Sequence, residues 1–191
     1  MTIIPKYRES GMPQEHHWKK FFKPQKILET LGVKEGHIVD VGSGYGTFTI
    51  PAARRTRDTV FAIEIDPEMI ERLKAQARQK NLENIKTLKR DVSRNGTGLK
   101  DNSVQHVLLF NILHGENPVG LLTEASRILN PNGTIAVIHW NYDPATPRGP
   151  PMQIRPKPEQ IIQWAKKAGL TLHKKYGLPP HHYGLVFKHG G

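Results

Sequence analysis

No cysteine occurs among the 191 residues of this sequence. A disulfide-stapled scaffold, a thiolate zinc site and catalysis by a cysteine nucleophile are therefore excluded. A chain without cysteine also fits a reducing compartment, so we expect a cytoplasmic protein.

Long apolar runs are also missing. No stretch approaches the ~18 apolar residues of a membrane span, and residues 1–13, MTIIPKYRESGMP, lack the apolar core of a signal peptide. Internal repeats and low-complexity tracts are absent as well. We therefore expect a soluble protein with no membrane partner.

Acidic residues are few relative to basic ones. The sequence has 28 Lys and Arg against 17 Asp and Glu, a net charge of +11. Such a surplus is compatible with RNA as a partner. Between Asp101 and Pro147, however, the only basic residue is Arg127. The remaining cations crowd onto expected outer helix faces and edge strands, where solvated charge is usual, so the charge does not argue strongly for RNA.

The length and the hydrophobic content of 37% suit one globular domain. Apolar runs alternate with helical patterns, which is typical of a doubly wound parallel sheet. Asp66 and Pro67 predict a helix start, and residues 130–133, NPNG, predict a turn. We expect strands over 37–41, 59–63, 85–90, 104–110, 134–139, 170–175 and 183–188. We expect helices over 15–31 (one or two, interrupted near Pro24), 47–55, from 66 through 77, 118–129 and 158–169.

The most informative segment is the glycine-rich loop over residues 39–46, VDVGSGYG, between an expected strand and helix. Glycine permits positive φ and lets a ligand approach the backbone closely. In a parallel sheet, ligands bind beyond the carboxyl ends of the strands at the switch point. A tight strand-to-helix turn is the alternative interpretation of the glycines taken alone.

Three carboxylates end the first three expected strands: Asp40, Glu64 and Asp91. Glu64 follows Gly46 by 18 positions, and an acidic side chain about 20 residues beyond the loop can hold ribose hydroxyls. Carboxylates around one crevice favour a cationic or hydroxyl-rich ligand over a phosphate. As alternatives, Asp91 caps the turn over 92–96 and Asp40 braces the loop.

The glycine spacing is G-x-G-x-G, unlike the G-x-G-x-x-G of nicotinamide and flavin enzymes. An ordered set of motifs spans about residues 36–140: VDVGSGYG, AIEIDPEMIERLKAQA, LKRDV, FNILHG and LLTEASRILNPNGTIAVIHW. This set resembles the class I S-adenosylmethionine-dependent methyltransferases, in particular their small-molecule, type 11-like members. The resemblance implies S-adenosylmethionine as cofactor. It also implies a Rossmann-like, three-layer αβα fold with a seven-stranded, mostly parallel sheet and an antiparallel last strand.

The resemblance also implies how one methyltransferase domain over 1–191 is organised. Residues 1–35 would form a helical extension or lid, 36–140 the cofactor-binding core, and 141–191 a substrate loop, a helix and two strands. Aromatic residues of the extension would either cover the cofactor or pack in the core; they are Tyr7, Trp18, Phe21 and Phe22.

Roles at the methionine end of the cofactor follow from the resemblance. Asp40 would orient the amino group, and Phe110 and Asn111 would lie near the carboxylate and sulfonium. The cofactor-binding loop would comprise Gly42, Ser43, Gly44, Tyr45 and Gly46.

At the nucleoside end, the resemblance implies that Glu64 binds the ribose. Asp91 would contact the adenine amino group, with Val92 against the ring and Ile65 covering its other side.

Methyl transfer from a sulfonium needs alignment, and a base only when the nucleophile must lose a proton. His114 is the candidate base because it follows the fourth strand and imidazole titrates near neutral pH. A hydrogen-bonded packing role is its alternative. His139, which ends the fifth strand beside Trp140 and Tyr142, is the second catalytic candidate. For these three residues both substrate contact and local packing stay open.

The Pro-rich loop over 143–158 contains Arg148 and Arg155, which could clamp a carboxylate or phosphate of the substrate. A solvated linker with capping arginines is the alternative. The acceptor is therefore expected to be a small molecule, with an anionic one favoured by these arginines. We expect no metal, because the adjacent pairs His16–His17 and His181–His182 point in different directions and lack a third ligand.

Rival functions remain open. The N-P-P-Y-like signature of base and amide N-methylation is missing, since Asn111 is followed by Ile-Leu-His114. An RNA or protein methyltransferase is one alternative. A non-catalytic, cofactor-binding interaction module is another. The glycine spacing and Asp91 count against a nicotinamide oxidoreductase.

Overall fold

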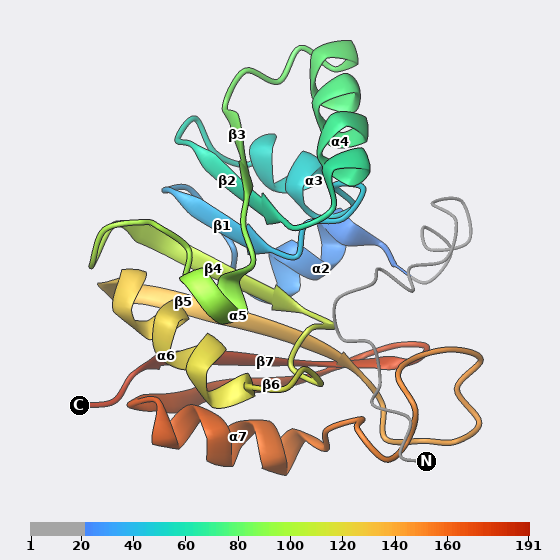
Figure 1. Ribbon diagram of the computed structural model, residues 1–191. Coiled ribbons are helices and arrows are strands. Elements are labelled where there is room, and N and C mark those ends of the chain that lie inside the picture. Colours follow the sequence, from blue (N-terminus) through green and yellow to red (C-terminus); the bar gives the residue numbers. More distant parts are fainter. Residues whose placement is uncertain (1–21) are drawn as a thin grey trace.

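A seven-stranded sheet forms the centre of the protein, whose computed structural model describes residues 22–191 (Figure 1). The strand order is β3-β2-β1-β4-β5-β7-β6. All neighbouring pairs are parallel except those of β7, which is antiparallel to both β5 and β6. The expected mostly parallel, doubly wound sheet with an antiparallel last strand is thus confirmed.

The strands are β1 Ile38–Val41, β2 Val60–Glu64, β3 Ile85–Lys89, β4 Val104–Phe110, β5 Leu129–Trp140, β6 Leu170–Leu178 and β7 His182–His189. The helices are α2 Pro24–Thr30, α3 Thr49–Ala53, α4 Pro67–Gln79, α5 Val92–Asn95, α6 Pro118–Ile128 and α7 Pro158–Lys167. Several expectations fall outside the described residues, namely the N-terminal part of the helical extension, Tyr7, His16, His17, Trp18 and Phe21. None of the helices within 22–191 is long and apolar enough to cross a membrane.

Helices cover both faces of the sheet, which gives three layers (Figure 1). On one face, buried β-strand residues such as Val107 and Val137 pack against α6 and α7. On the other face, residues such as Leu108 and Ile138 pack against α2 and α3. Consecutive side chains of one strand thus pack in the hydrophobic cores on opposite faces of the sheet, because side chains alternate along a strand.

The start of α4 follows its sequence signal. The Asp66 side chain accepts hydrogen bonds from the backbone N–H groups of Glu68, at 2.8 Å, and Met69, at 3.5 Å, and Pro67 is the first helical residue. Such a cap contributes about 1 kcal/mol. It also sets where the chain leaves β2, directly after Glu64.

The expected turn over 130–133 is wrong, because β5 begins at Leu129 and includes these residues. The pairing register changes from Val104 with Leu129 to His106 with Thr134, so the NPNG segment is a bulge within the strand. Leu129 is fully buried, which holds the chain on the sheet before the bulge.

Other boundaries also differ from the sequence prediction. The helix α3 is shorter than 47–55, and β6 runs on to Leu178. Pro24 starts α2 rather than interrupting a helix, which suits proline at a first helical position. The segment after Asp91, expected as a turn, forms the single-turn helix α5.

Candidate functional site

The order of the strands predicts where a ligand would bind. The strand β1 pairs with β2 on one side and β4 on the other, so the chain winds away from β1 in both directions. The carboxyl ends of these parallel strands share one edge of the sheet, where ligands of such folds bind. The glycine loop follows β1, and the three candidate carboxylates lie at or just beyond the ends of β1, β2 and β3. His114 lies beyond the end of β4, and His139 lies near the end of β5.

The glycine loop needs its glycines. Gly42, Gly44 and Gly46 have φ of 72°, 52° and 82°, in the left-handed region. A Cβ at Gly46 would overlap Leu73 of α4, and one at Gly42 would lie 3.1 Å from a methyl carbon of Ile112. The glycines therefore permit both the left-handed backbone and the close packing of the loop on Leu73 and Ile112.

Asp40 is buried at the end of β1 and braces the loop. Its Oδ2 accepts a hydrogen bond of 2.6 Å from the hydroxyl of Thr49, the first residue of α3. Burial raises the pKa of Asp40 to about 6, and the negative charge of Glu64 adds to this rise. The hydrogen bond links the end of β1 to the start of α3, on the far side of the glycine loop.

Glu64 connects the end of β2 to the glycine loop. Its Oε2 accepts a 2.8 Å hydrogen bond from the backbone N–H of Gly44. Its Oε1 accepts from the backbone N–H groups of Ile65, at 2.8 Å, and Asp66, at 3.1 Å. The carboxylate is 7% exposed and lies between the first two strands of the site.

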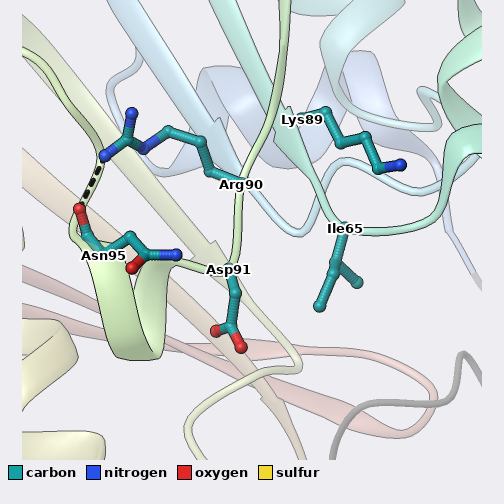
Figure 2. Close-up of a pocket in the computed structure, with 5 residues that line it drawn as sticks. All are labelled: Ile65, Lys89, Arg90, Asp91 and Asn95. Atoms are coloured by element: carbon teal, nitrogen blue, oxygen red, sulfur yellow. Dashed lines mark hydrogen bonds between the residues drawn. The ribbon is translucent and has the colours of Figure 1, made fainter.

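An open pocket of about 520 Å³ lies beyond β2 and β3, lined by Ile65, Lys89, Arg90, Asp91 and Asn95 (Figure 2). Figure 2 shows the side chains of Ile65 and Asp91 pointing the same way from neighbouring segments. Ile65 is 39% exposed, which is unusual for a large apolar side chain in this protein. An apolar surface beside a carboxylate suits a flat, nitrogen-bearing ring.

Asp91 also has the capping role considered from the sequence. Its Oδ1 accepts from the backbone N–H of Ser93 at 3.1 Å and from the Ser93 hydroxyl at 2.5 Å. Val92 packs against the core on the α6 side rather than lining the pocket.

Three pocket residues, Lys89, Arg90 and Asn95, were not expected from the sequence. Arg90 donates to the backbone oxygens of Asn95, at 2.8 Å, and Gly96, at 3.1 Å, and so holds the loop after α5 in place. Their position beside Asp91 in the LKRDV motif is the signal that could have identified Lys89 and Arg90.

Asn111 carries a buried side chain without a partner. Neither its Oδ1 nor its Nδ2 has a hydrogen bond among the described residues, although its backbone N–H donates to Ile138 at 2.8 Å. Its φ of 56° is uncommon for a non-glycine residue. The Ser43 and Thr47 hydroxyls are likewise buried, with no hydrogen-bond partner in the described part of the chain. An unpaired buried polar group costs about 1–3 kcal/mol, so these atoms indicate a ligand site.

Aromatic side chains lie at the end of β4 and around the glycine loop. The rings of Phe110 and Phe48 meet edge to face at a centroid distance of 4.6 Å. Tyr45 is half-buried on the glycine loop, and the guanidinium carbon of Arg72 lies 5.6 Å from its ring centroid. Gln76 donates a 3.0 Å hydrogen bond to the Tyr45 carbonyl, which ties the loop to α4.

The two candidate base residues lie together. Nδ1 of His114 is 3.3 Å from Nε2 of His139, and the His139 ring stacks on Tyr183 at 6.3 Å. Burial lowers the pKa of His114 to about 4 and that of His139 well below its usual value. Both imidazoles are therefore uncharged at neutral pH.

Arg155 does not face the crevice as a substrate clamp. Its side chain is 6% exposed, and burial lowers the pKa of the guanidinium. The guanidinium donates its hydrogen bonds to residues of the loop itself. Arg155 therefore stabilises the loop, and the expectation that it clamps the substrate is corrected. The acceptors are the backbone oxygens of Asn141, Asp143, Arg148 and Pro150 and the hydroxyl of Thr146.

The other residues expected at the substrate differ in exposure. Arg148 is exposed on the loop. Tyr142 is 45% exposed, with the Lys157 ammonium 4.7 Å from its ring centroid. Trp140 is buried, and its ring lies 4.2 Å from that of His182.

Metal ligation finds no support in the part of the chain that the structure describes, where no group of three or more His, Asp or Glu side chains is placed to hold an ion.

Residues 38–133, which contain the glycine loop, the pocket and Asn111, match the family model described as a methyltransferase domain. An uncharacterized methyltransferase of Mycobacterium tuberculosis is 30% identical over 124 residues, covering 63% of this chain and 46% of that protein. The demethylmenaquinone methyltransferase of Tropheryma whipplei is 30% identical over 131 residues, covering 68% and 50% respectively. The chain thus spans about half the length of the curated relatives it matches.

A solved protein structure has the same fold. A SAM-dependent methyltransferase from Aquifex aeolicus superposes with a TM-score of 0.80 at 24% identity, covering 88% of this chain and 90% of that one.

Proposed function

The chain belongs to the methyltransferase domain family, and from this premise we propose that it transfers a methyl group from S-adenosylmethionine to a small acceptor molecule. The observation that carries the proposal is the pocket beyond β2 and β3, which is lined by Ile65 and Asp91. Glu64, the last residue of β2, immediately precedes Ile65. The bound cofactor supplies a methyl group activated by a sulfonium.

The nucleoside would be held by the pocket. Ile65 offers an exposed apolar surface to the adenine, and Asp91 offers a carboxylate to its amino group. Glu64 is the acceptor for the ribose hydroxyls, on the same carboxylate that binds the Gly44 N–H. An anionic side chain at the end of β2 suits a diol, which donates two hydrogen bonds.

The methionine end would be held by the glycine loop and Asn111. The unpaired amide of Asn111 and hydroxyl of Ser43 provide one donor–acceptor pair and one further polar group for the amino acid part. Asp40, whose carboxylate accepts a hydrogen bond from Thr49, would orient the amino group. Gly42 is exposed and would leave its backbone open to the ligand.

The acceptor would be shaped by the loop between β5 and α7. Arg155 holds this loop from within, and Tyr142 and Arg148 remain exposed on it. Arg148 is the cation that supports an anionic acceptor. We place His114 at the reacting end of this site, where its uncharged imidazole can receive a proton.

Calorimetric titration with S-adenosylhomocysteine tests the cofactor site. Wild-type protein is expected to bind, and Glu64→Ala to raise Kd at least about tenfold, equivalent to about 1.4 kcal/mol. Glu71→Ala is the matched control, because Glu71 is exposed on α4 and its only ion pair within residues 22–191 is with Lys74. Absence of binding to folded wild-type protein would overturn the proposed function.

The acceptor class is tested by transfer of radiolabelled methyl into a cell extract, followed by separation of small molecules, RNA and protein. Label in the small-molecule fraction supports the proposal. Label in RNA or protein instead identifies one of the macromolecular classes and overturns the small acceptor. Co-purified partners without any transfer would indicate an interaction module.

A further inference from the structure

The hydroxyl of Thr47 is a buried donor that the proposed cofactor site does not use. Its Oγ1 atom has no hydrogen-bond partner among residues 22–191. The same holds for Oγ of Ser43 and for both amide atoms of Asn111, which already belong to that site. Because an unpaired buried hydroxyl destabilises the folded chain, the surroundings of Thr47 indicate what it would bind.

Two contacts hold the glycine loop against the segment that follows β4. A Cβ at Gly42 would lie 3.1 Å from a methyl carbon of Ile112, and the Phe48 ring meets the Phe110 ring at a centroid distance of 4.6 Å. Phe110 ends β4, and Asn111 lies between it and Ile112. Both ends of the loop over 42–48 therefore lie against the segment that carries the unpaired amide.

The two unpaired hydroxyls lie next to these contacts. Ser43 directly follows Gly42, and Thr47 directly precedes Phe48. The two hydroxyls and the amide of Asn111 thus gather where the loop meets the end of β4. This is the carboxyl edge of the parallel strands, where ligands of such folds bind.

The chemistry of these three side chains matches a carboxylate. Two hydroxyls and one amide group can donate several hydrogen bonds, and an ionised carboxylate accepts about four and donates none. An ammonium group needs acceptors instead, and Asp40, which is 3% exposed, offers a carboxylate on β1. Neutral donors on the loop and an acid on the strand together suit an α-amino acid group, which carries both charges.

We propose that Thr47 is a further cofactor-binding residue, whose hydroxyl donates a hydrogen bond to the carboxylate of the amino acid part of S-adenosylmethionine. This inference rests on the proposed methyl transfer and adds a third side chain to the donors at that carboxylate. Binding forms the hydrogen bond that the free protein lacks. The hydroxyl therefore lowers the stability of the free protein and raises its affinity for the cofactor, so its removal changes the two properties in opposite directions.

The first test is Thr47→Val, which keeps the shape of the side chain and removes the hydroxyl. The urea midpoint of the free protein is expected to rise by about 0.3–1 M. In calorimetry, Kd for S-adenosylhomocysteine is expected to rise at least about tenfold, equivalent to about 1.4 kcal/mol. Thr47→Ser restores the hydroxyl and is expected to bind within about threefold of wild type. A lower urea midpoint or an unchanged Kd in Thr47→Val overturns the proposal.

Decarboxylated S-adenosylhomocysteine identifies the group that the hydroxyl binds. Wild-type protein is expected to bind this probe more weakly than S-adenosylhomocysteine, and Thr47→Val is expected to bind it as wild type does. An equal loss of affinity for both ligands in Thr47→Val overturns the assignment to the carboxylate. Wild type that binds neither ligand is a failure of the proposed function. Wild type that binds S-adenosylhomocysteine, with Kd unchanged in Thr47→Val, is a failure of this inference alone.

Thr56→Val is the matched control, because the Thr56 side chain is buried but paired. Its hydroxyl donates to the Gly36 carbonyl at 3.1 Å and accepts from the backbone N–H of Asp58 at 3.0 Å. Thr56 lies before β2, at the edge of the sheet opposite the glycine loop. This variant is expected to have a lower urea midpoint and an unchanged Kd for S-adenosylhomocysteine, the reverse of the pattern expected for Thr47→Val.

Discussion

Glu64 and Gly44 are joined by a buried hydrogen bond of 2.8 Å, from the backbone N–H of the glycine to the carboxylate of the acid. The bond links the loop after β1 to the end of β2. The side chain proposed to hold the ribose therefore also stabilises the loop proposed to hold the methionine. Substitution of Glu64 is expected to change both stability and binding.

For Glu64→Ala we predict a free energy of unfolding lower by about 1.5–3 kcal/mol, the usual range for hydrogen bonds to a charged group. Three backbone N–H groups lose this acceptor: those of Gly44, Ile65 and Asp66. Urea unfolding measures the change. Glu71→Ala is expected to stay within about 0.5 kcal/mol of wild type. Equal unfolding midpoints for the two variants would contradict the linking role of Glu64.

Gly46→Ala is predicted to destabilise the protein more than Gly169→Ala. Both glycines have left-handed φ, 82° and 75°. A Cβ at Gly169 meets no atom within 4 Å, so that variant suffers only the backbone strain, about 1–2 kcal/mol. At Gly46 the new methyl also overlaps the fully buried Leu73. Urea midpoints of the two variants test this order, and equal losses would show that the contact with Leu73 relaxes freely.

Stability is predicted to fall as the pH drops from about 6.5 to about 5. Burial lowers the pKa of His106 and His114 to about 4 and that of His182 to about 3, so the unfolded chain takes up these protons first. Each such histidine contributes a loss of about 1.4 kcal/mol per pH unit below its unfolded pKa. Asp40 offsets the loss from about one histidine. Its pKa is raised to about 6, so the folded chain binds that proton first and gains stability as the pH falls.

Urea unfolding at several pH values measures this dependence. His182→Phe is expected to show a shallower fall than wild type, since it removes one histidine that resists protonation. A stability that stays level between neutral pH and pH 5 would mean that these imidazoles open to water without unfolding.

Arg155→Lys is predicted to loosen the loop between β5 and α7. A lysine keeps the charge but cannot reach several carbonyl oxygens at once, as the guanidinium does. We expect a loss of about 1–3 kcal/mol and faster proteolytic cleavage within residues 141–157. Arg148→Lys serves as the control because Arg148 is exposed. Identical cleavage rates in the two variants would show that the loop does not depend on Arg155.

Local signals predicted most of the sheet. The glycine loop, the cap at Asp66 and the alternating apolar runs each depend on residues close in sequence, so their elements were found in the right order. The start of β5 was missed because the NPNG segment has the composition of a turn, whereas its conformation is set by pairing of Leu129 with Val104, 25 residues away.

The sequence predicted those site residues that lie at the carboxyl ends of the strands. Glu64 and Asp91 end neighbouring parallel strands, and Asp91 lines the pocket there because parallel strands bring their carboxyl ends together. Arg155 was misjudged because its partners, such as Asn141 and Pro150, surround it only after the loop has closed. The contact between His114 and His139 was also not predicted, because the sequence does not specify how the ends of β4 and β5 are aligned.

The enclosed Arg155 separates the shape of its loop from the residues on its outer surface. Backbone carbonyls, which every residue type provides, supply nearly all of the contacts to the guanidinium. Tyr142 and Arg148 can therefore be exchanged while the backbone keeps its course. The outward side chains of this loop are therefore the positions at which the proposed acceptor site can be redesigned while Arg155 keeps the backbone in place.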